Sequence, residues 1–398
     1  MIPRILTSWL AQPLTPTQHA PPLESAHLIL NGPVGRHTRF SDHEVTFYGG
    51  TNYLGLANHP LTRMAAGYAA LKYGTSVAAS RITTGTAKPH IMLERSLALY
   101  MGTKDAVICG SGGDANRILL NGITNFNDVV FCEQTAHPTL LESVPKNIRT
   151  QFFSQDDLTD LEHQLQGIDH GLILINGVNA LTGRIAPLDQ LYQLMRQRPG
   201  LRLVVDDCHG VFVLGLRGKG TVEHFGIRSD QVFQTGTMSK ALGSFGGFIA
   251  GSKELCQQLR DTTTYRASTP LPPPVAAASI ASIALLLSRG SDLRRALLHN
   301  AKYLATRLND LGFETTFYGT PILSIKPPQD VDAKKLSDDL LREGIYLPFI
   351  RYPHKDSPGQ LRLALSAAHL QEDIDALCDQ LVQACNRHRE QSAAIQTI

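Results

Sequence analysis

The sequence lacks the features that mark secreted scaffolds and polyanion-binding proteins. Six cysteines in 398 residues show no paired spacing, so they do not indicate a disulfide framework. The formal net charge is only +2, so no field of one sign favours nucleic acid or a membrane surface as the main partner. A chain of 398 residues, 42% hydrophobic and 18% charged, is instead enough for one large and one smaller domain with well-formed cores.

Long hydrophobic runs are also scarce. The most apolar segment, residues 275–287, has 13 residues, which is short for a membrane span. The first ten residues carry one arginine and a short apolar stretch, and residues 12–22 are polar and rich in proline, unlike a signal peptide. We therefore expect a cytoplasmic protein without a membrane span, with a mobile N-terminal arm over residues 1–45.

Apolar β-type runs alternate with amphipathic helical stretches, which predicts an α/β fold with a mostly parallel sheet. The predicted strands are 106–109, 129–132, 172–175, 203–205, 232–235 and 247–250, followed by 322–325, 345–348 and 361–365. The predicted helices are 114–123, 158–165, 188–196, 275–287, a charged one from residue 290 to 311, and 371 to about 387. We place a large domain at 46–285 and a smaller C-terminal domain at 286–398.

Two short motifs indicate the chemistry. Asp206 ends one apolar run in Val-Val-Asp-Asp-Cys-His-Gly, and Lys240 follows the next run in Thr-Met-Ser-Lys. A lysine can hold the aldehyde of pyridoxal phosphate (PLP) as a Schiff base, and an aspartate can keep the pyridine nitrogen protonated, because an adjacent anion favours the charged form. Alone, the lysine could be a solvated loop residue and Asp-Asp-Cys-His could be half a metal site. The pair, in this order, favours PLP chemistry on an amino acid.

A glycine-rich turn supplies a candidate phosphate site. The run from residue 110 to 113, Gly-Ser-Gly-Gly, follows a predicted strand and precedes a helix that Asp114 could cap. Backbone amides at a helix N-terminus suit an anion. The turn is neither a Rossmann fingerprint nor a Walker loop, so on its own it could also be just a tight connection.

From Thr51 to His369 the chain resembles the α-oxoamine synthase family, which are fold-type I PLP enzymes with an aspartate aminotransferase-like fold. The resemblance rests on landmarks in one order: 52–60 (Asn-Tyr-Leu-Gly-Leu-Ala-Asn-His-Pro), 79–81, Gly85, 93–94, 111–112, 115–116, His137, 206–210, 237–243, 268–269, 361–363 and 367–369. The family includes 8-amino-7-oxononanoate synthase, 2-amino-3-ketobutyrate ligase, 5-aminolevulinate synthase and serine palmitoyltransferase. The landmarks do not choose among these members.

The resemblance implies a role for each matched residue. Lys240, His137, Asp206 and His209 would be catalytic, with His137 stacked on the cofactor ring and His209 bonded to its phenolic oxygen. Arg362 would bind the substrate carboxylate through its planar pair of donors, with Asn52 also at the substrate. A structural ion pair is the alternative for Arg362, and a capping or surface position is the alternative for His137. The remaining residues implied at the cofactor are Gly112, Gly113, Cys208 (as a small hydrophobe), Thr237, Ser268 and Thr269.

Ser268 and Thr269 resemble a family segment that reaches the phosphate of the neighbouring subunit, which implies a homodimer with shared active sites. The chain departs from the common family pattern at Thr51, Gly113, Asn176, Ala180 and Gln360. At Asn176 and Ala180 the chain therefore lacks an acid and a hydroxyl that many members have near the cofactor. We expect no metal-binding residues.

The resemblance implies a PLP-dependent acyltransferase. Such an enzyme condenses a small amino acid, activated by loss of its α-proton to Lys240, with an acyl thioester, and loses carbon dioxide to give an α-aminoketone. Glycine, alanine and serine are all candidate substrates, and coenzyme A or an acyl carrier protein could carry the acyl group. The alternatives are another PLP reaction, such as racemisation, aldol cleavage or transamination, and a non-catalytic partner subunit, against which Lys240 argues.

Overall fold

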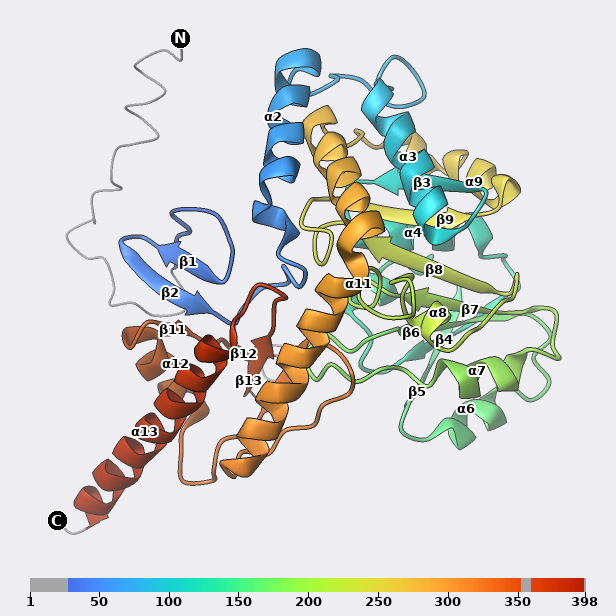
Figure 1. Ribbon diagram of the computed structural model, residues 1–398. Coiled ribbons are helices and arrows are strands. Elements are labelled where there is room, and N and C mark those ends of the chain that lie inside the picture. The colour runs from blue at the N-terminus through green and yellow to red at the C-terminus, as the bar shows by residue number, and fades with distance from the viewer. Residues whose placement is uncertain (1–27, 352–358, 397–398) are drawn as a thin grey trace.

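The computed structural model describes residues 28–351 and 359–396 (Figure 1). The greater part of the predicted arm, residues 1–27, lies outside this range. Its described remainder is folded: β1 (His37–Phe40) and β2 (His43–Phe47) form an antiparallel hairpin. β2 also pairs in parallel with β11 (Ile345–Tyr346), near the other end of the chain.

A seven-stranded sheet forms the centre of the molecule, in the order β3-β9-β8-β7-β6-β4-β5. β9 runs antiparallel to β3 and β8, and the neighbouring pairs from β8 to β5 are parallel, as the alternating pattern predicts. The strands are β3 (Asp105–Cys109), β4 (Val129–Glu133), β5 (Arg149–Phe153), β6 (Gly171–Asn176), β7 (Leu201–Asp206), β8 (Val232–Thr237) and β9 (Gly247–Gly251).

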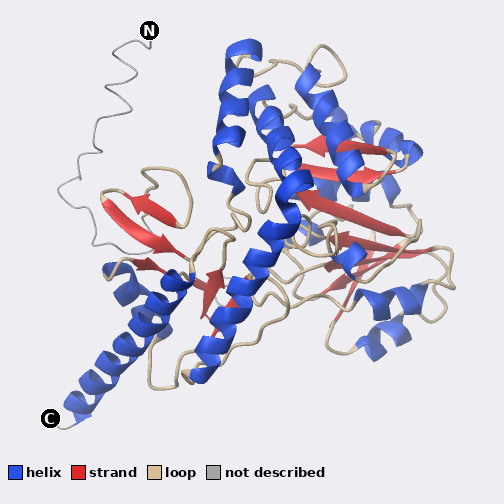
Figure 2. Cartoon of the chain, in the orientation of Figure 1, coloured by secondary structure: helices blue, strands red, loops and turns tan. Residues whose placement is uncertain are grey.

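Helices cover both faces of this sheet (Figure 2). Leu172 and Leu174 of β6 pack with the α4 layer, whereas Ile173 and Ile175 pack with the α6 and α7 layer, because successive strand residues point to opposite faces. Burial on both faces explains why the central strands are nearly continuous apolar runs. The helices of these layers are α4 (Gly112–Ile123), α5 (Pro138–Leu141), α6 (Leu158–Gln164), α7 (Leu188–Met195), α8 (Thr221–His224), α9 (Lys253–Arg260) and α10 (Thr263–Ala267).

One long helix, α11 (Pro273–Asp310), replaces the two helices that the sequence pattern predicts. The expected end at Leu287 and new start at Gly290 are wrong. A glycine inside a helix costs only roughly 1 kcal/mol, and here it makes room for a neighbour, since a Cβ at 290 would lie 2.9 Å from Nη1 of Arg294. The predicted domain boundary near residue 285 falls within α11, and the division into two domains stays a prediction.

α11 packs along α2 (Pro60–Tyr73), which follows the short helix η2 (Leu56–Asn58), and along α3 (Lys88–Met101). Within the described residues it is the one helix whose length and hydropathy would suit a membrane span, and 39% of its most apolar window is buried. The packing against α2 and α3 accounts for that buried part.

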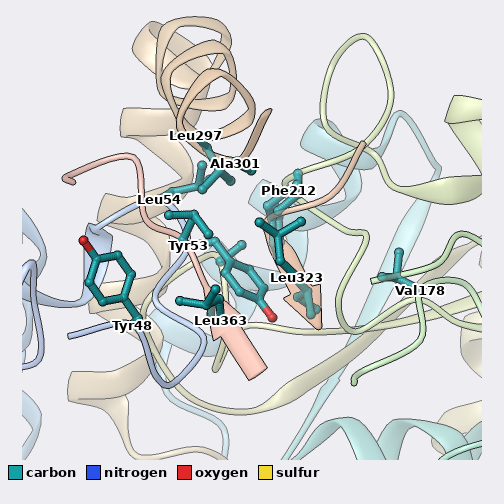
Figure 3. Packing of buried hydrophobic residues seen from close by; sticks show 14 of the residues in the cluster. Tyr48, Tyr53, Leu54, Val178, Phe212, Leu297, Ala301, Leu323 and Leu363 are labelled. Atoms are coloured by element: carbon teal, nitrogen blue, oxygen red, sulfur yellow. The ribbon is translucent and has the colours of Figure 1, made fainter. Parts of the chain in front are cut away.

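The C-terminal part contains a second sheet of order β10-β13-β12, covered by α12 (Ala333–Arg342) and α13 (Gln371–Gln396). Its strands are antiparallel: β10 (Ile322–Ile325), β12 (Phe349–Arg351) and β13 (Gly359–Ala364). A single apolar cluster joins this sheet to the large one. In this cluster, Leu323 and Leu363 of the second sheet pack with Leu297 of α11 and with Tyr53 and Phe212 (Figure 3).

Candidate active site

Lys240 lies in the turn after β8, at the edge where the parallel strands end. Its Nζ is 2.9 Å from Nε2 of His209, which follows β7. The other ring nitrogen of His209, Nδ1, is 2.8 Å from the hydroxyl of Tyr53. The fold therefore joins the predicted lysine and histidine in one chain of contacts and adds a tyrosine to it.

Arg362 extends this chain from β13. Its Nη2 donates to the Tyr53 hydroxyl at 3.4 Å, and its Nε donates to the carbonyl of Ala180 at 2.6 Å. The side chain is buried, yet it makes no ion pair within the described residues. A buried guanidinium held only by neutral groups is costly unless an anion joins it. This arrangement favours carboxylate binding over a structural ion pair.

The two histidines at this edge are neutral. Burial lowers the pKa of His209 well below its usual value, and the positive charges of Lys240 and Arg362 lower it further. Burial also lowers the pKa of His137, and the nearby Asp206 carboxylate opposes this effect. A neutral imidazole can accept a proton, and His137 is the better suited of the two, because the strongly lowered pKa of His209 makes that ring a weak base.

Asp206 ends β7 and is buried. Its Oδ1 accepts from the backbone N–H of Cys208 at 3.1 Å, and its Oδ2 accepts from Nδ2 of Asn116 at 2.7 Å. Burial raises the pKa of the Cys208 thiol well above its usual value. Cys208 is therefore a buried, neutral thiol.

The turn before α4 lies beside these residues. A Cβ at Gly112 would lie 2.7 Å from Sγ of Cys208 and 3.4 Å from Cβ of Thr237, so this position requires glycine. Thr237 is held by a hydrogen bond to the carbonyl of Gly246. At Gly113 a Cβ would be tolerated, since its nearest neighbour, Cβ of Thr139, is 3.4 Å away. The amine, the carboxylate and the helix N-terminus thus lie at one sheet edge, which fits the aldehyde, the pyridine nitrogen and the phosphate of PLP.

In the described part of the chain, the side chains of three predicted site residues form no hydrogen bond or ion pair with Lys240, His209, Asp206 or Arg362. Asn52 uses its side chain to bond the carbonyl of Val34 and the N–H of Ala57. Ser268 donates to the carbonyl of Thr264, and Thr269 is exposed. Among the same residues, no group of three or more His, Cys, Asp or Glu side chains is arranged as a metal site.

Comparison with known proteins agrees with this geometry. The family model for class I and II aminotransferases matches residues 50–381. The 8-amino-7-oxononanoate synthase of Geobacter sulfurreducens is 36% identical over 83% of this chain and 86% of its own length. That of Thermoanaerobacter pseudethanolicus is 33% identical over 87% of this chain and 89% of its own. The chain belongs to the α-oxoamine synthase branch of the class I and II aminotransferase family.

Solved structures show that this α-oxoamine synthase has the expected fold-type I architecture. Serine palmitoyltransferase of Sphingomonas wittichii superposes with a TM-score of 0.85 at 23% identity, over 97% of this chain and 95% of that one. The 8-amino-7-oxononanoate synthase of Francisella tularensis gives 0.72 at 21% identity, over 89% of this chain and 99% of that one. At this identity the likeness supports the fold alone.

The departures from the family pattern have structural consequences in this α-oxoamine synthase. Asn176, where many members have an acid, accepts a hydrogen bond from the backbone N–H of His137 at 2.6 Å. Ala180 contributes its carbonyl to Arg362. Gln360 bonds Ser324 on the neighbouring strand β10. The first two departures therefore contact predicted site residues, and the third lies within the C-terminal sheet.

Sequence reasoning gave no role to Tyr53 and Asn116, and it kept Asp207 only as the alternative to Asp206 as partner of the pyridine nitrogen. Tyr53 and Asn116 are family landmarks without an assigned role. Their buried polar groups contact His209 and Asp206, which lie far away in the sequence, so only the folded structure reveals these contacts. Asp207 faces away from the lysine: its Oδ2 accepts from the N–H of Thr221 at 2.6 Å and from Nε2 of Gln234. Burial raises the pKa of Asp207 to about 7, although these bonds oppose the shift.

The buried carboxyl of Asp207 predicts a pH-dependent stability. Its pKa rises from 3.8 unfolded to about 7 folded, so folding favours the protonated form. The stabilisation that this protonated carboxyl contributes to the free energy of unfolding is complete below about pH 4 and is lost as the pH rises through 7. Asp207→Asn keeps an acceptor for Thr221 and removes the titration, so its stability relative to wild type should rise from pH 5 to pH 8 by on the order of a few kcal/mol.

Thermal unfolding at several pH values measures this difference. Asp292→Asn, on the exposed side of α11, is the matched control and should follow wild type at every pH. A constant difference between Asp207→Asn and wild type would show that Asp207 is already ionised in the folded protein.

Proposed function

We propose that this protein is a PLP-dependent acyltransferase that condenses a small amino acid with an acyl thioester, with loss of carbon dioxide, to form an α-aminoketone. The observation that supports this most is the contact chain from Lys240 through His209 and Tyr53 to Arg362, with Asp206 beside it. One end of that chain offers an amine for the cofactor aldehyde, and the other end offers a guanidinium for the substrate carboxylate. Family membership supports the same reaction class.

Bound PLP supplies an electron sink for the amino-acid α-carbon. The chain's own residues then orient the reactants and move protons. Arg362 binds the carboxylate and so fixes which bonds of the α-carbon face Lys240, whose Nζ can take the α-proton. His209, neutral and bonded to Tyr53, holds Nζ at a defined position. His137 is a second neutral base at the same edge.

The amino acid, the acyl chain and the acyl carrier are set by contacts beyond this cluster. Coenzyme A and an acyl carrier protein present the same thioester group, so either could deliver the acyl chain. We also propose that the reaction takes place in the cytoplasm. Release of free thiol and carbon dioxide from small amino acids and a panel of acyl thioesters tests the reaction. Amino-acid turnover without thiol release would contradict acyl transfer and favour another PLP reaction.

We further propose that the enzyme is a homodimer with shared active sites. α2 has four exposed apolar side chains on one stripe, at the spacing of three and four residues that places them on one helix face: Leu61, Met64, Tyr68 and Leu71. An apolar stripe of this kind on a helix that is otherwise packed against α11 suits a protein interface. Ser268 and Thr269, which have no recorded contact with Lys240 in the described residues, would then serve the partner's site.

Lys240→Ala should remove covalent attachment of PLP and lower turnover by at least about 10²–10⁴-fold, because both the amine and the base are lost. Borohydride treatment followed by mass spectrometry measures the attachment, and thiol release measures turnover. Lys253→Ala, on the surface, is the control. Normal turnover by Lys240→Ala would refute the assignment of the lysine.

Arg362→Lys should lose the two-pronged geometry but keep the charge, and Arg362→Ala should lose both. Removing a charged hydrogen-bond partner costs about 1.5–3 kcal/mol, or roughly ten- to a hundredfold in amino-acid affinity. Spectral titration of the PLP-loaded protein with alanine or glycine measures the affinity, while PLP binding should barely change. Arg351→Ala, on the neighbouring strand β12, should match wild type. Unchanged affinity in Arg362→Ala would leave Arg362 a structural residue.

Met64→Glu should dissociate the proposed dimer, because it places a charge within the apolar stripe of α2. Light scattering after gel filtration should then give the monomer mass of 43.5 kDa, and wild type should give twice that mass. Leu311→Glu, at the far end of α11, should leave the mass at the wild-type value (Figure 1). If the Met64→Glu protein stays dimeric, the apolar stripe of α2 is not the interface, and another surface must form it.

A further inference from the structure

Asn116 lies in the first turns of α4 and is fully buried. Its Nδ2 donates to Oδ2 of Asp206 at 2.7 Å, and its Oδ1 accepts from the hydroxyl of Thr235 at 2.6 Å. Asp206 and Thr235 are paired in register on the neighbouring strands β7 and β8. The amide of Asn116 therefore bridges two neighbouring strands at the carboxylate that is predicted to face the cofactor.

This bridge requires one orientation of the amide. A carboxylate can only accept hydrogen bonds, so the NH₂ group of Asn116 must face Asp206. The carbonyl end of the amide then faces Thr235, whose hydroxyl can donate to it. Aspartate at position 116 could donate only when protonated, and leucine, with nearly the same shape, could not hydrogen-bond at all. Asparagine is thus the side chain of this shape that can donate to the Asp206 carboxylate and accept from Thr235 without itself titrating.

Asp206 receives only neutral donors in the described structure. Cys208 N–H bonds one oxygen and Asn116 bonds the other, and within the described residues no lysine or arginine forms an ion pair with it. Hydrogen bonds to a carboxylate favour its charged form. Because the donors are uncharged, they support the anion without neutralising it, and the full charge remains for a cation that binds above it.

We propose that Asn116 is a positioning residue that fixes the plane of the Asp206 carboxylate toward the pyridine nitrogen of the cofactor. This inference rests on the proposed function. Its consequence is that the protonation of the bound ring depends on a side chain of α4 that does not contact the ring. Thr235 acts one step further away, by holding the amide in the required orientation.

Solution NMR of protein loaded with PLP labelled with ¹⁵N at the pyridine nitrogen tests the proposal, because the ¹⁵N shift reports ring protonation without turnover. Asp206→Asn gives the reference shift for a ring without its anion. Asn116→Leu should move the signal from the wild-type value toward this reference, with the pH midpoint of ring deprotonation lowered by about one to two units. Asn121→Leu, on the exposed side of α4, should keep the wild-type midpoint.

Asn116→Asp provides a rescue that a merely structural residue would not show. Below the pKa of the new carboxyl it can donate to Asp206 and should give the wild-type signal. Above that pKa it can no longer donate to Asp206, and it adds a second negative charge near the ring, which favours ring protonation. The ¹⁵N titration of this variant should then be displaced to higher pH than the wild-type curve, opposite to the shift expected for Asn116→Leu. This variant is isosteric, so it keeps the test valid if Asn116→Leu fails to fold.

Wild-type ¹⁵N titration curves in both the Asn116→Asp and the Asn116→Leu proteins would overturn the role of Asn116 alone. A wild-type protein that does not attach PLP through Lys240 would instead overturn the proposed function. The two failures are therefore distinguishable in the same set of samples.

Discussion

The parallel pairing of β7 with β8 is the constraint on which the site depends. It sets Asp206 beside Thr235 and brings the turns after both strands, with His209 and Lys240, to one edge of the sheet. A register shift by one residue would turn Asp206 to the opposite face and break the bridge to Asn116. Burial of both faces of these strands resists such a shift, since it would also exchange the two apolar layers.

The site contains two buried charges of opposite sign that do not neutralise each other. Asp206 is held by Asn116 and a backbone N–H, and Arg362 is held by a hydroxyl and carbonyls. Neither forms an ion pair within the described residues. Each buried charge is stabilised only by hydrogen bonds to uncharged groups. A ligand with a cationic ring and an anionic carboxylate complements both charges at once. The two charges are therefore the ones that the proposed binding of an amino acid to a pyridine cofactor requires.

The sequence predicted the parts of the fold whose signal is local. The central strands are continuous apolar runs, and the residues after β7 and β8 could be placed together because parallel strands end at the same edge. The contact between Tyr53 and Arg362 joins residues 309 positions apart, so no local pattern could reveal it. Strands β1, β2 and β5 are short and partly exposed and carry little apolar signal. The break expected at Gly290 failed because the packing of the helix outweighs the propensity of one residue.

The continuity of α11 limits how this enzyme can open and close. Its 38 residues form a rod of roughly 57 Å that packs on α2 and α3 at one end and against the C-terminal elements at the other. Along this crossing the chain is a continuous helix and not a loop, so a rotation of β13 relative to the large sheet would have to bend the helix or slide along it. A movement that separates Arg362 from Tyr53 by rotating β13 would therefore work against the packing of α11. Gly290, near the middle of α11, is the position at which the helix would bend most easily, because glycine has a low helix propensity.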